Sequence, residues 1–255
     1  NIVHNSARLT PLEEDPAPPL MNEEVKGGSA VFKLQAACPF RAFAELRLGA
    51  RALRQADIGL DAMARGLLMH RVLEKVWRAL ASHAQLIAMN DSQLQALVNN
   101  MVSEAIDEIA SRYPQTFTRR FREMETERLC RHVLEWLELE KQRVPFRVVE
   151  TETKHEATAG GVRVQLKIDR IDELTDGRRV VIDYKTGEVK PAQWFGDRPD
   201  EPQLPLYSMA VSGDIAGVLF AQVKAGGMAF NGVTADEGLA PGVKSFETLS
   251  QTREA

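Results

Sequence analysis

The period of the hydrophobic pattern changes near Pro145, and this change constrains the fold more than any other feature of the chain. Before it, over residues 29–143, apolar residues recur at the spacing of amphipathic helices. After it, residues 146–157, 162–174 and 178–186 read as three strands separated by turn residues. We therefore expect an α+β domain in which a helical first half packs on a sheet.

Local signals set the expected boundaries within this pattern. We expect an N-cap at Asn90-Asp91 and breaks at Pro39 and Pro114. Further elements are expected as helices at 30–48, 63–83, 91–113, 121–144 and 203–211, and as a strand at 215–223. The proline-rich residues 1–28 are expected to be an arm or linker. The remainder reads as one domain cut from a longer polypeptide, with a helical part (29–143), a sheet core (144–233) and a truncated tail (234–255).

Composition narrows the function only in part. The chain has 32 lysines and arginines against 36 aspartates and glutamates, so its net charge of −4 argues against binding a nucleic acid by bulk charge. Any site for a polyanion must therefore be local. No apolar run approaches the ~20 residues that span a bilayer, and the two cysteines, Cys38 and Cys130, form no CxxC pair. We expect a reduced, cytoplasmic setting.

The turn between the second and third expected strands decides whether their acidic residues meet. A two-residue turn on Asp176-Gly177 would put Asp169 and Asp183 on opposite faces of the hairpin. A three-residue loop that begins at Thr175 instead places Asp169 directly across from Asp183. Its last residue is then a glycine, which the left-handed position of such a loop favours. We therefore expect the three-residue loop.

This register sorts the hairpin residues into two faces. One face is expected to carry Lys167, Asp169, Ile171, Val181, Asp183 and Lys185, and the other Leu166, Ile168, Arg170, Val180, Ile182 and Tyr184. Two carboxylates with Cβ atoms on the order of 5 Å apart repel each other unless a cation lies between them. Oxygen ligands favour Mg²⁺ or Mn²⁺. Lys185 would lie beside that ion, where it could orient or deprotonate a water or stabilise charge on a phosphate. The same D-x-K pattern also fits a surface ion pair on a solvated edge.

Several separated motifs extend this pattern in order along the chain. They are "CPFRAFAELRL", "RGLLMHRVLE" with His70, "IDRID" with Asp169, "VIDYKTG" with Asp183 and Lys185, and "QLPLY" with Gln203 and Tyr207. Over roughly residues 30–225 this set resembles the RecB-like branch of the PD-(D/E)XK nucleases, which includes the nuclease domains of AddAB-type DNA repair helicase-nucleases. The resemblance implies a restriction-endonuclease-like core, with a mixed sheet flanked by helices.

The resemblance also implies roles for single residues. Carried over motif by motif, it makes His70, Asp169, Asp183 and the backbone carbonyl of Tyr184 ligands of a metal ion, and it makes Lys185 the catalytic lysine. His70 has independent support, because it lies at the margin of the apolar stripe of its expected helix and can lean toward a neighbouring sheet. Without the family context, the same position fits a histidine at the edge of the core.

Two further pairs of residues are candidates for this site. Gln203 and Tyr207 lie four residues apart on one helix face, and the resemblance places them beside the active site, touching DNA or supporting the lysine. Without it they read as a polar helix end and a half-buried tyrosine. Glu150 and Glu152, on the strand before the hairpin, are candidates for a further carboxylate, although strand alternation also permits a solvent face.

The cysteines depart from the pattern of some relatives. Those relatives hold an iron–sulfur cluster with one cysteine in the "CPF" segment and three near the C-terminus. Cys38 matches the first, but no cysteine follows Cys130. We therefore expect no iron–sulfur cluster in this chain, and we expect Cys130 to be a core residue.

Together these observations predict a Mg²⁺- or Mn²⁺-dependent DNA exonuclease of repair or recombination, to which a helicase module delivers the strand. Residues 119–122 and 47–54, both rich in arginine, could line a DNA path or form a solvated helix face. One alternative is an inactive nuclease-like domain that binds DNA or acts as a scaffold, but no motif acid or lysine is lost. Another is a small-molecule phosphohydrolase, but no phosphate-cradling glycine loop or histidine-rich metal site is present.

Overall fold

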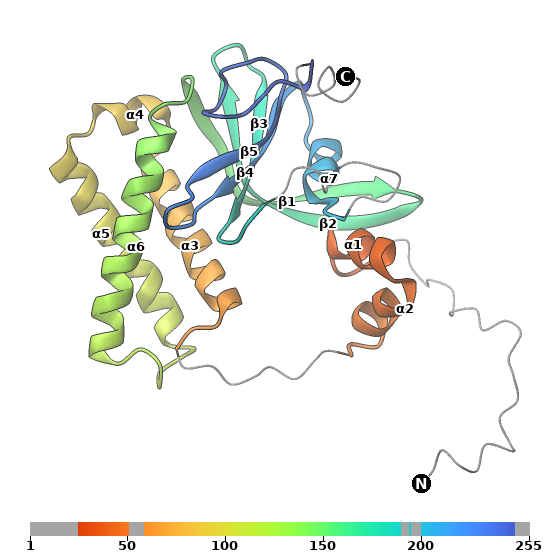
Figure 1. Cartoon of the computed structure of the whole chain (residues 1–255), viewed down its shortest axis with the longest axis horizontal. Helices are drawn as coiled ribbons and strands as arrows, with labels where there is room; N and C mark the ends of the chain where they lie inside the picture. The colour runs from red at the N-terminus through yellow and green to blue at the C-terminus, as the bar shows by residue number, and fades with distance from the viewer. Residues whose placement is uncertain (1–24, 51–58, 190–193, 195–199, 248–255) are drawn as a thin grey trace, which may run out of the picture.

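A five-stranded mixed sheet with helices on both faces forms the centre of the computed structural model (Figure 1). The structure describes residues 25–50, 59–189, 194 and 200–247. The strands are ordered β1-β2-β3-β4-β5, and all neighbours are antiparallel except β3 and β4, which are parallel. Helix α7 (Gln203–Ala210) lies in the connection between this parallel pair, which a tight turn could not make. The fold is therefore the α+β class predicted from the sequence.

Four of the five strands lie within two residues of their expected bounds. The strands are β1 (Phe146–Ala159), β2 (Val162–Leu174), β3 (Arg179–Lys185), β4 (Ile215–Gln222) and β5 (Ala229–Thr234). Strand β5 was not expected, because asparagine and glycine, which strands disfavour, lie in its middle. It pairs with β4 so closely that a Cβ atom on Gly232 would lie 2.3 Å from the Val218 carbonyl oxygen, and only glycine fits there.

Seven helical segments precede the sheet in the part of the chain that the structure describes. They are α1 (Ala30–Ala37), α2 (Pro39–Ala42), the π-helical turn η2 (Phe43–Arg47), α3 (Ala62–Leu80), α4 (His83–Ala88), α5 (Asp91–Ala110) and α6 (Arg119–Glu140). The expected break occurs at Pro39, and Asn90 forms the expected cap, in a reciprocal capping box with Gln93. Among the described helices, none is both long and apolar enough to cross a membrane.

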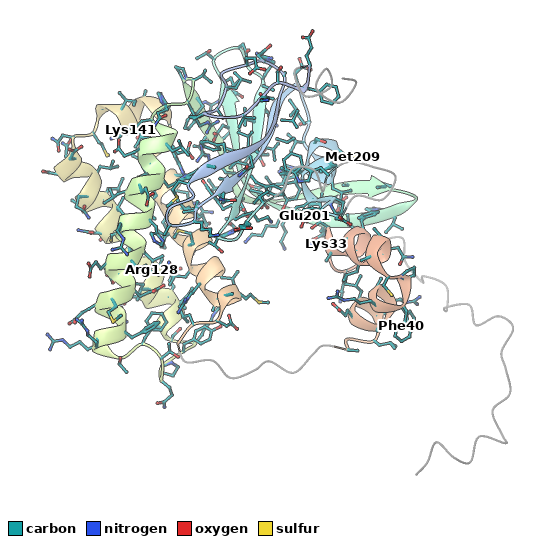
Figure 2. The ribbon with its side chains drawn as sticks, viewed as in Figure 1. Lys33, Phe40, Arg128, Lys141, Glu201 and Met209 are labelled. Carbon is teal, nitrogen blue, oxygen red and sulfur yellow. The ribbon has the colours of Figure 1, made fainter. Side chains whose placement is uncertain are left out.

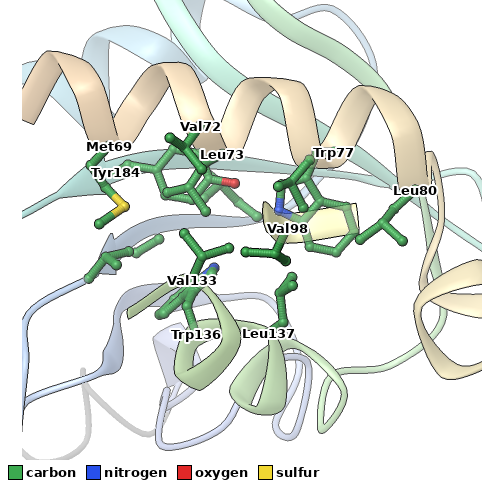
Figure 3. Close-up of a cluster of buried hydrophobic side chains, with 14 of the residues drawn as sticks. Met69, Val72, Leu73, Trp77, Leu80, Val98, Val133, Trp136, Leu137 and Tyr184 are labelled. Atoms are coloured by element: carbon green, nitrogen blue, oxygen red, sulfur yellow. The ribbon is translucent and has the colours of Figure 1, made fainter. Parts of the chain in front are cut away.

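Two hydrophobic clusters, one on each face, hold the sheet between its helical layers. On one face α3, α5 and α6 pack against the sheet, and Figure 3 shows Trp77 of α3, Trp136 of α6 and Tyr184 of β3 in this cluster, where the Trp136 and Tyr184 rings meet edge-on. Cys130 of α6 is buried in this cluster, as expected. On the other face α7 covers Val181 of β3. Neighbouring residues of β3 thus face different layers, so its acidic and aromatic residues are separated.

The ends of the expected domain pack against this core where they are described. Val25 of the expected arm donates its N–H to the Arg163 carbonyl of β2, and residues 1–24 lie outside the described residues. An ion pair of 2.5 Å joins Lys33 of α1 to Glu201, just before α7 (Figure 2). In the expected tail, Val243 lies in the helical-side cluster, and residues 248–255 are outside the described part.

The β2–β3 hairpin has the register expected from its loop. Arg170 pairs with Ile182, and the ladder continues to Glu173 and Arg179. The loop ends at Gly177, whose φ of 85° lies in the left-handed region that the three-residue loop requires. Turn chemistry therefore predicted the pairing of residues 170–173 correctly, but the expected pair of Asp169 and Asp183 is not in the ladder, which ends at Arg170 and Ile182.

The expected sorting of hairpin side chains into two faces is wrong at the start of β2. Leu166 and Ile168 pack in the cluster under α7, whereas Arg170, expected on the same face, lies over the Trp77 ring in the helical layer. On the neighbouring β1 the ladder has a bulge, and Glu152 has a left-handed φ of 55°. Such irregularities increase local twist and redirect side chains, and strict alternation does not foresee them.

Candidate metal centre and active site

Asp169 lies at the fork where β2 and β3 separate. The regular ladder between these strands ends at the pair Arg170 and Ile182. Beyond it, the Asp169 Oδ2 atom accepts a hydrogen bond of 2.8 Å from the Tyr184 N–H and lies 3.2 Å from His70 Nδ1 of α3. The histidine ring meets the Tyr184 ring edge-on. The fork thus brings the helical layer and the hairpin to one carboxylate.

Glu152 of β1 completes a compact group with His70 and Asp169. One ligand atom from each residue lies within 4.8 Å of the other two, so the three could hold a metal ion. The left-handed backbone of Glu152 is uncommon for a residue other than glycine and marks the bend that brings it here. Glu150, the other candidate, instead bonds His155 at 2.6 Å. The sequence identified these two glutamates as candidates, but it did not show which of the two joins the site.

Asp183 lies beside this group and is buried, with 2% of its surface exposed. Its Oδ1 atom accepts a hydrogen bond of 2.6 Å from Gln203. Its Oδ2 atom lies 2.7 Å from Lys185 Nζ, but the angles do not make a hydrogen bond, and this buried oxygen has no hydrogen-bond partner. A buried carboxylate oxygen without a hydrogen bond is ready to accept a further ligand.

Gln203 links the lysine to the acid. Its Oε1 atom accepts a hydrogen bond of 2.6 Å from Lys185 Nζ, while its Nε2 atom lies 2.6 Å from both Asp183 Oδ1 and the Tyr207 hydroxyl. Tyr207 in turn donates to the Lys167 carbonyl of β2 at 2.7 Å. Helix α7 therefore holds the lysine at a fixed position, and the structure brings this predicted pair into the site.

A model of the PD-(D/E)XK nuclease superfamily matches residues 31–254, a range that includes every residue of the candidate site. The chain belongs to this superfamily. Members of the superfamily are typically metal-dependent nucleases. A search of curated proteins finds no match to the chain.

Burial and mutual repulsion shift the pKa values of the acids in this PD-(D/E)XK site. Burial first, and then the neighbouring Asp169 charge, raise the pKa of Asp183 to about 6. Burial also raises the pKa of Glu152. Burial lowers the pKa of His70, but its bond to Asp169 and the nearby acid charges outweigh that effect, and its pKa is raised. Burial is the first cause of the shifts at Asp183 and Glu152, and the charge of Asp169 raises the pKa of all three groups, an effect that a cation would offset.

The donor set of the nuclease-superfamily site fits a divalent cation. Two carboxylates and one imidazole converge, the Asp183 carboxylate lies beside them, and hard oxygen donors suit Mg²⁺ or Mn²⁺ while an imidazole also suits other transition metals. Two features of the structure support such a site. Asp183 Oδ2 has no hydrogen-bond partner, and ligand atoms of Glu152, Asp169 and His70 lie close together.

A pocket of about 450 Å³ opens beside the candidate ligands of the nuclease-superfamily domain. It lies between α3, the end of α5 and the β1–β2 hairpin, and His70, Glu152 and Asp169 line one wall. It is large enough for part of a substrate rather than for water alone.

The arginines expected to line a DNA path are mostly engaged with acids. Arg119 and Arg120 at the start of α6 both contact Glu123, and Arg122 pairs with Asp107. Residues 51–54 of the other arginine-rich stretch lie outside the described residues. These ion pairs offset the local positive charge, so the predicted path gains little support from them.

A buried charge network behind the nuclease-superfamily site escaped sequence analysis. Arg170 bonds Asp172 on β2 and Glu140 on α6, each through two nitrogens, and also donates to the Tyr184 hydroxyl. Arg143 adds a second cation bonded to Glu140 and Asp172. The signal was present, because an arginine on an apolar face requires a buried acidic partner.

Proposed function

We propose that this chain is the nuclease domain of a RecB-like repair or recombination protein, a metal-dependent exonuclease that hydrolyses DNA phosphodiesters. One observation carries the proposal: in a chain of the PD-(D/E)XK superfamily, Asp169, Asp183 and Lys185 converge at one fork, and Gln203 holds the lysine against the second acid. We further propose a cytoplasmic setting and a helicase module that delivers the DNA strand.

His70, Asp169, Asp183 and the carbonyl of Tyr184 are the proposed metal ligands, and Glu152 is added because it joins the same group. The cation, Mg²⁺ or Mn²⁺, would supply Lewis-acid stabilisation of phosphate charge and a more acidic water. The carboxylates would hold the ion, and the Tyr184 N–H, which donates to Asp169 Oδ2, fixes the orientation of that carboxylate. His70 joins the helical layer to the same centre.

Lys185 is the proposed catalytic lysine. Its side chain is 31% exposed, and its ammonium group is held between Gln203 and Asp183. From there it can donate a hydrogen bond to a phosphate oxygen whose negative charge grows in the transition state. Gln203 and Tyr207 are proposed positioning residues, since they bond to the lysine and to the acid, respectively, and fix the distance between them.

The test is cleavage of linear DNA labelled at one end, with Mg²⁺ or Mn²⁺, by the wild type and by Asp183→Ala and Lys185→Ala. Removing either group should lower cleavage by at least about 100-fold. Lys244→Ala serves as the control, because Lys244 lines a separate pocket with Gln142 and should leave cleavage unchanged. Circular DNA tests the exonuclease proposal, because an exonuclease requires a free end.

Equal cleavage by all four proteins would contradict the proposed site. Cleavage of circular DNA as fast as linear DNA would contradict the exonuclease proposal while leaving the nuclease intact. Binding of DNA by the wild type without cleavage would instead favour an inactive, nuclease-like scaffold of a helicase-nuclease complex.

A further inference from the structure

Two lysines of the β1–β2 hairpin face each other beside the metal ligands. Lys154 of β1 and Lys167 of β2 are direct partners in the antiparallel ladder, and both are exposed. Partners of this kind share one face of the sheet, with Cβ atoms about 5 Å apart, and like charges there are destabilising. The pair therefore costs the hairpin stability.

Acidic neighbours offset only one of these charges. Lys167 forms an ion pair with Glu152, which holds it at the rim of the candidate metal site. In the part of the chain that the structure describes, Lys154 has no ion-pair partner, and Glu156, two residues along on the same face, bonds to neither lysine. Since β1 is the edge strand, Lys154 presents its charge at the border of the sheet.

A third cation lies across the adjoining pocket. Lys167 lines this pocket from β2, and Arg112 lines it from the turn that follows α5. Arg112 is exposed and forms no ion pair with any described residue. His70 and Asp169 line the same pocket as these two cations. The three cations thus belong to the wall of this pocket, in the case of Arg112 and Lys167, and to the neighbouring edge of the sheet, in the case of Lys154.

A negatively charged polymer explains this arrangement. A phosphate bound between two lysines removes their repulsion, and a strand with regularly spaced phosphates can contact several cations in a line. The chain as a whole is negatively charged, and acids also line the pocket, so Lys154 and Arg112, which form no ion pair with any described residue, supply the positive charge that a phosphate would meet. We propose that Lys154, Lys167 and Arg112 form a cationic track that binds the backbone phosphates on either side of the one that is cut. This inference rests on the proposed nuclease function and adds substrate contacts outside the metal site.

Binding measured without cleavage tests the cationic track. Fluorescein-labelled oligonucleotides, single-stranded and duplex, are titrated with protein in Ca²⁺, and the Kd is taken from anisotropy at several salt concentrations. Lys154→Ala and Arg112→Ala should each raise the Kd about 3- to 10-fold at low salt and reduce the salt slope by about 0.7–0.9. Lys154→Arg should retain most of the affinity, since it keeps the charge. Lys167 is left intact, because its removal would free Glu152.

Two further measurements separate a binding role from a structural one. Lys154→Ala should leave the Tm equal to or above that of the wild type, because it removes a like-charge contact. With Mg²⁺ its KM for the oligonucleotide should rise while its kcat falls by less than about twofold. The matched control is Lys244→Ala, which removes the same charge from a separate pocket.

The outcomes also separate this inference from the proposed function. Equal Kd values and salt slopes for Lys154→Ala, Arg112→Ala and Lys244→Ala would overturn the track, even if the wild type cleaves DNA. Weaker binding by the two track variants, with a wild type that does not cleave, would support the track and contradict the nuclease. A wild type that neither binds nor cleaves would overturn both.

Discussion

The folded structure disfavours the negative charge of the Asp183 carboxylate. It is buried, it faces the Asp169 charge, and one of its oxygens has no hydrogen bond. Burial first, and then the Asp169 charge, raise its pKa to about 6 although Lys185 acts in the opposite direction, so the folded protein without a metal ion keeps this carboxylate charged at a cost in stability. Ligands of a cation are expected to show this conflict between stability and function.

We therefore predict that Asp183→Asn stabilises the metal-free protein at pH 8 by about 1–3 kcal/mol. Because the folded-state pKa is raised, the charged wild-type group costs stability above about pH 6, and this cost disappears as the pH falls toward the unfolded value near 4. The gain should accordingly be largest at pH 8 and absent near pH 4. Urea denaturation in EDTA at both pH values measures it.

A control on the exposed loop sharpens this prediction. Asp176 bonds the backbone and side chain of Arg178, and these bonds lower its pKa, so Asp176→Asn should bring no gain at pH 8. If Asp183→Asn proves less stable than the wild type in EDTA at pH 8, the account of Asp183 is wrong.

Gln203 should act on catalysis by positioning Lys185 against Asp183. Gln203→Ala removes the hydrogen bonds to Lys185 and Asp183 without removing a charge. We predict that kcat falls about 10- to 100-fold, because a misplaced lysine stabilises the transition state less well, while the KM for DNA changes little. Steady-state kinetics on an oligonucleotide separate the two constants. Gln142→Ala, in the turn that follows α6, is the control, and a rise in KM alone would contradict the positioning role.

At the scale of elements, Arg170 ties α6 to the hairpin that carries the site. It is fully buried, and its bonds to Glu140, Asp172 and Tyr184 cross from the helical layer to two strands. Burial raises the pKa of Asp172, but the charges of Arg170 and Arg143 outweigh that effect and leave it lowered. The two positive and two negative charges of this buried network thus offset each other.

Breaking this balance should be costly. Arg170→Met leaves two buried carboxylates with Arg143 as their only cation among the described residues, and we predict a loss of about 3–5 kcal/mol in the free energy of unfolding. Arg147→Met, which breaks the exposed ion pair with Glu173, should cost less than about 1 kcal/mol. Urea denaturation of both variants at pH 7 makes the comparison. Similar losses in the two would show that the network contributes no more than a surface pair.

Whether an element could be predicted from the sequence depends on whether its own residues carry a local signal for it. The register of the β2–β3 hairpin could be predicted because Gly177 fixes the length of the loop, and the loop length sets which residues of the two strands pair. The bend at Glu152 could not be predicted, because nothing in the neighbouring sequence indicates that this glutamate adopts a left-handed backbone. Strand β5 also escaped, since Gly232 is chosen for its fit against β4 rather than for strand propensity. Tertiary contacts decide all such positions.

At the scale of the whole molecule, the candidate site joins parts that are otherwise separate layers. His70 comes from α3, Glu152 from β1, Asp169 from β2, and Asp183 from β3, while α7 adds Gln203 from the opposite face. The motifs pointed to all of these residues except Glu152, which was one of two candidates on its strand, but only the fold shows that one small volume is shared by both helical layers. A cation bound there would connect the layers through a single centre.

Metal binding should therefore stabilise the entire fold. We predict that Mn²⁺ at about 100 times its Kd raises the free energy of unfolding by about 2.7 kcal/mol, since it binds only the folded chain. His70→Ala and Asp169→Asn should lose most of this gain. Lys185→Ala should keep it while losing cleavage, because it removes a cation and no ligand. Thermal denaturation with and without Mn²⁺ measures all four proteins, and an equal gain in the wild type and both ligand variants would place the metal elsewhere.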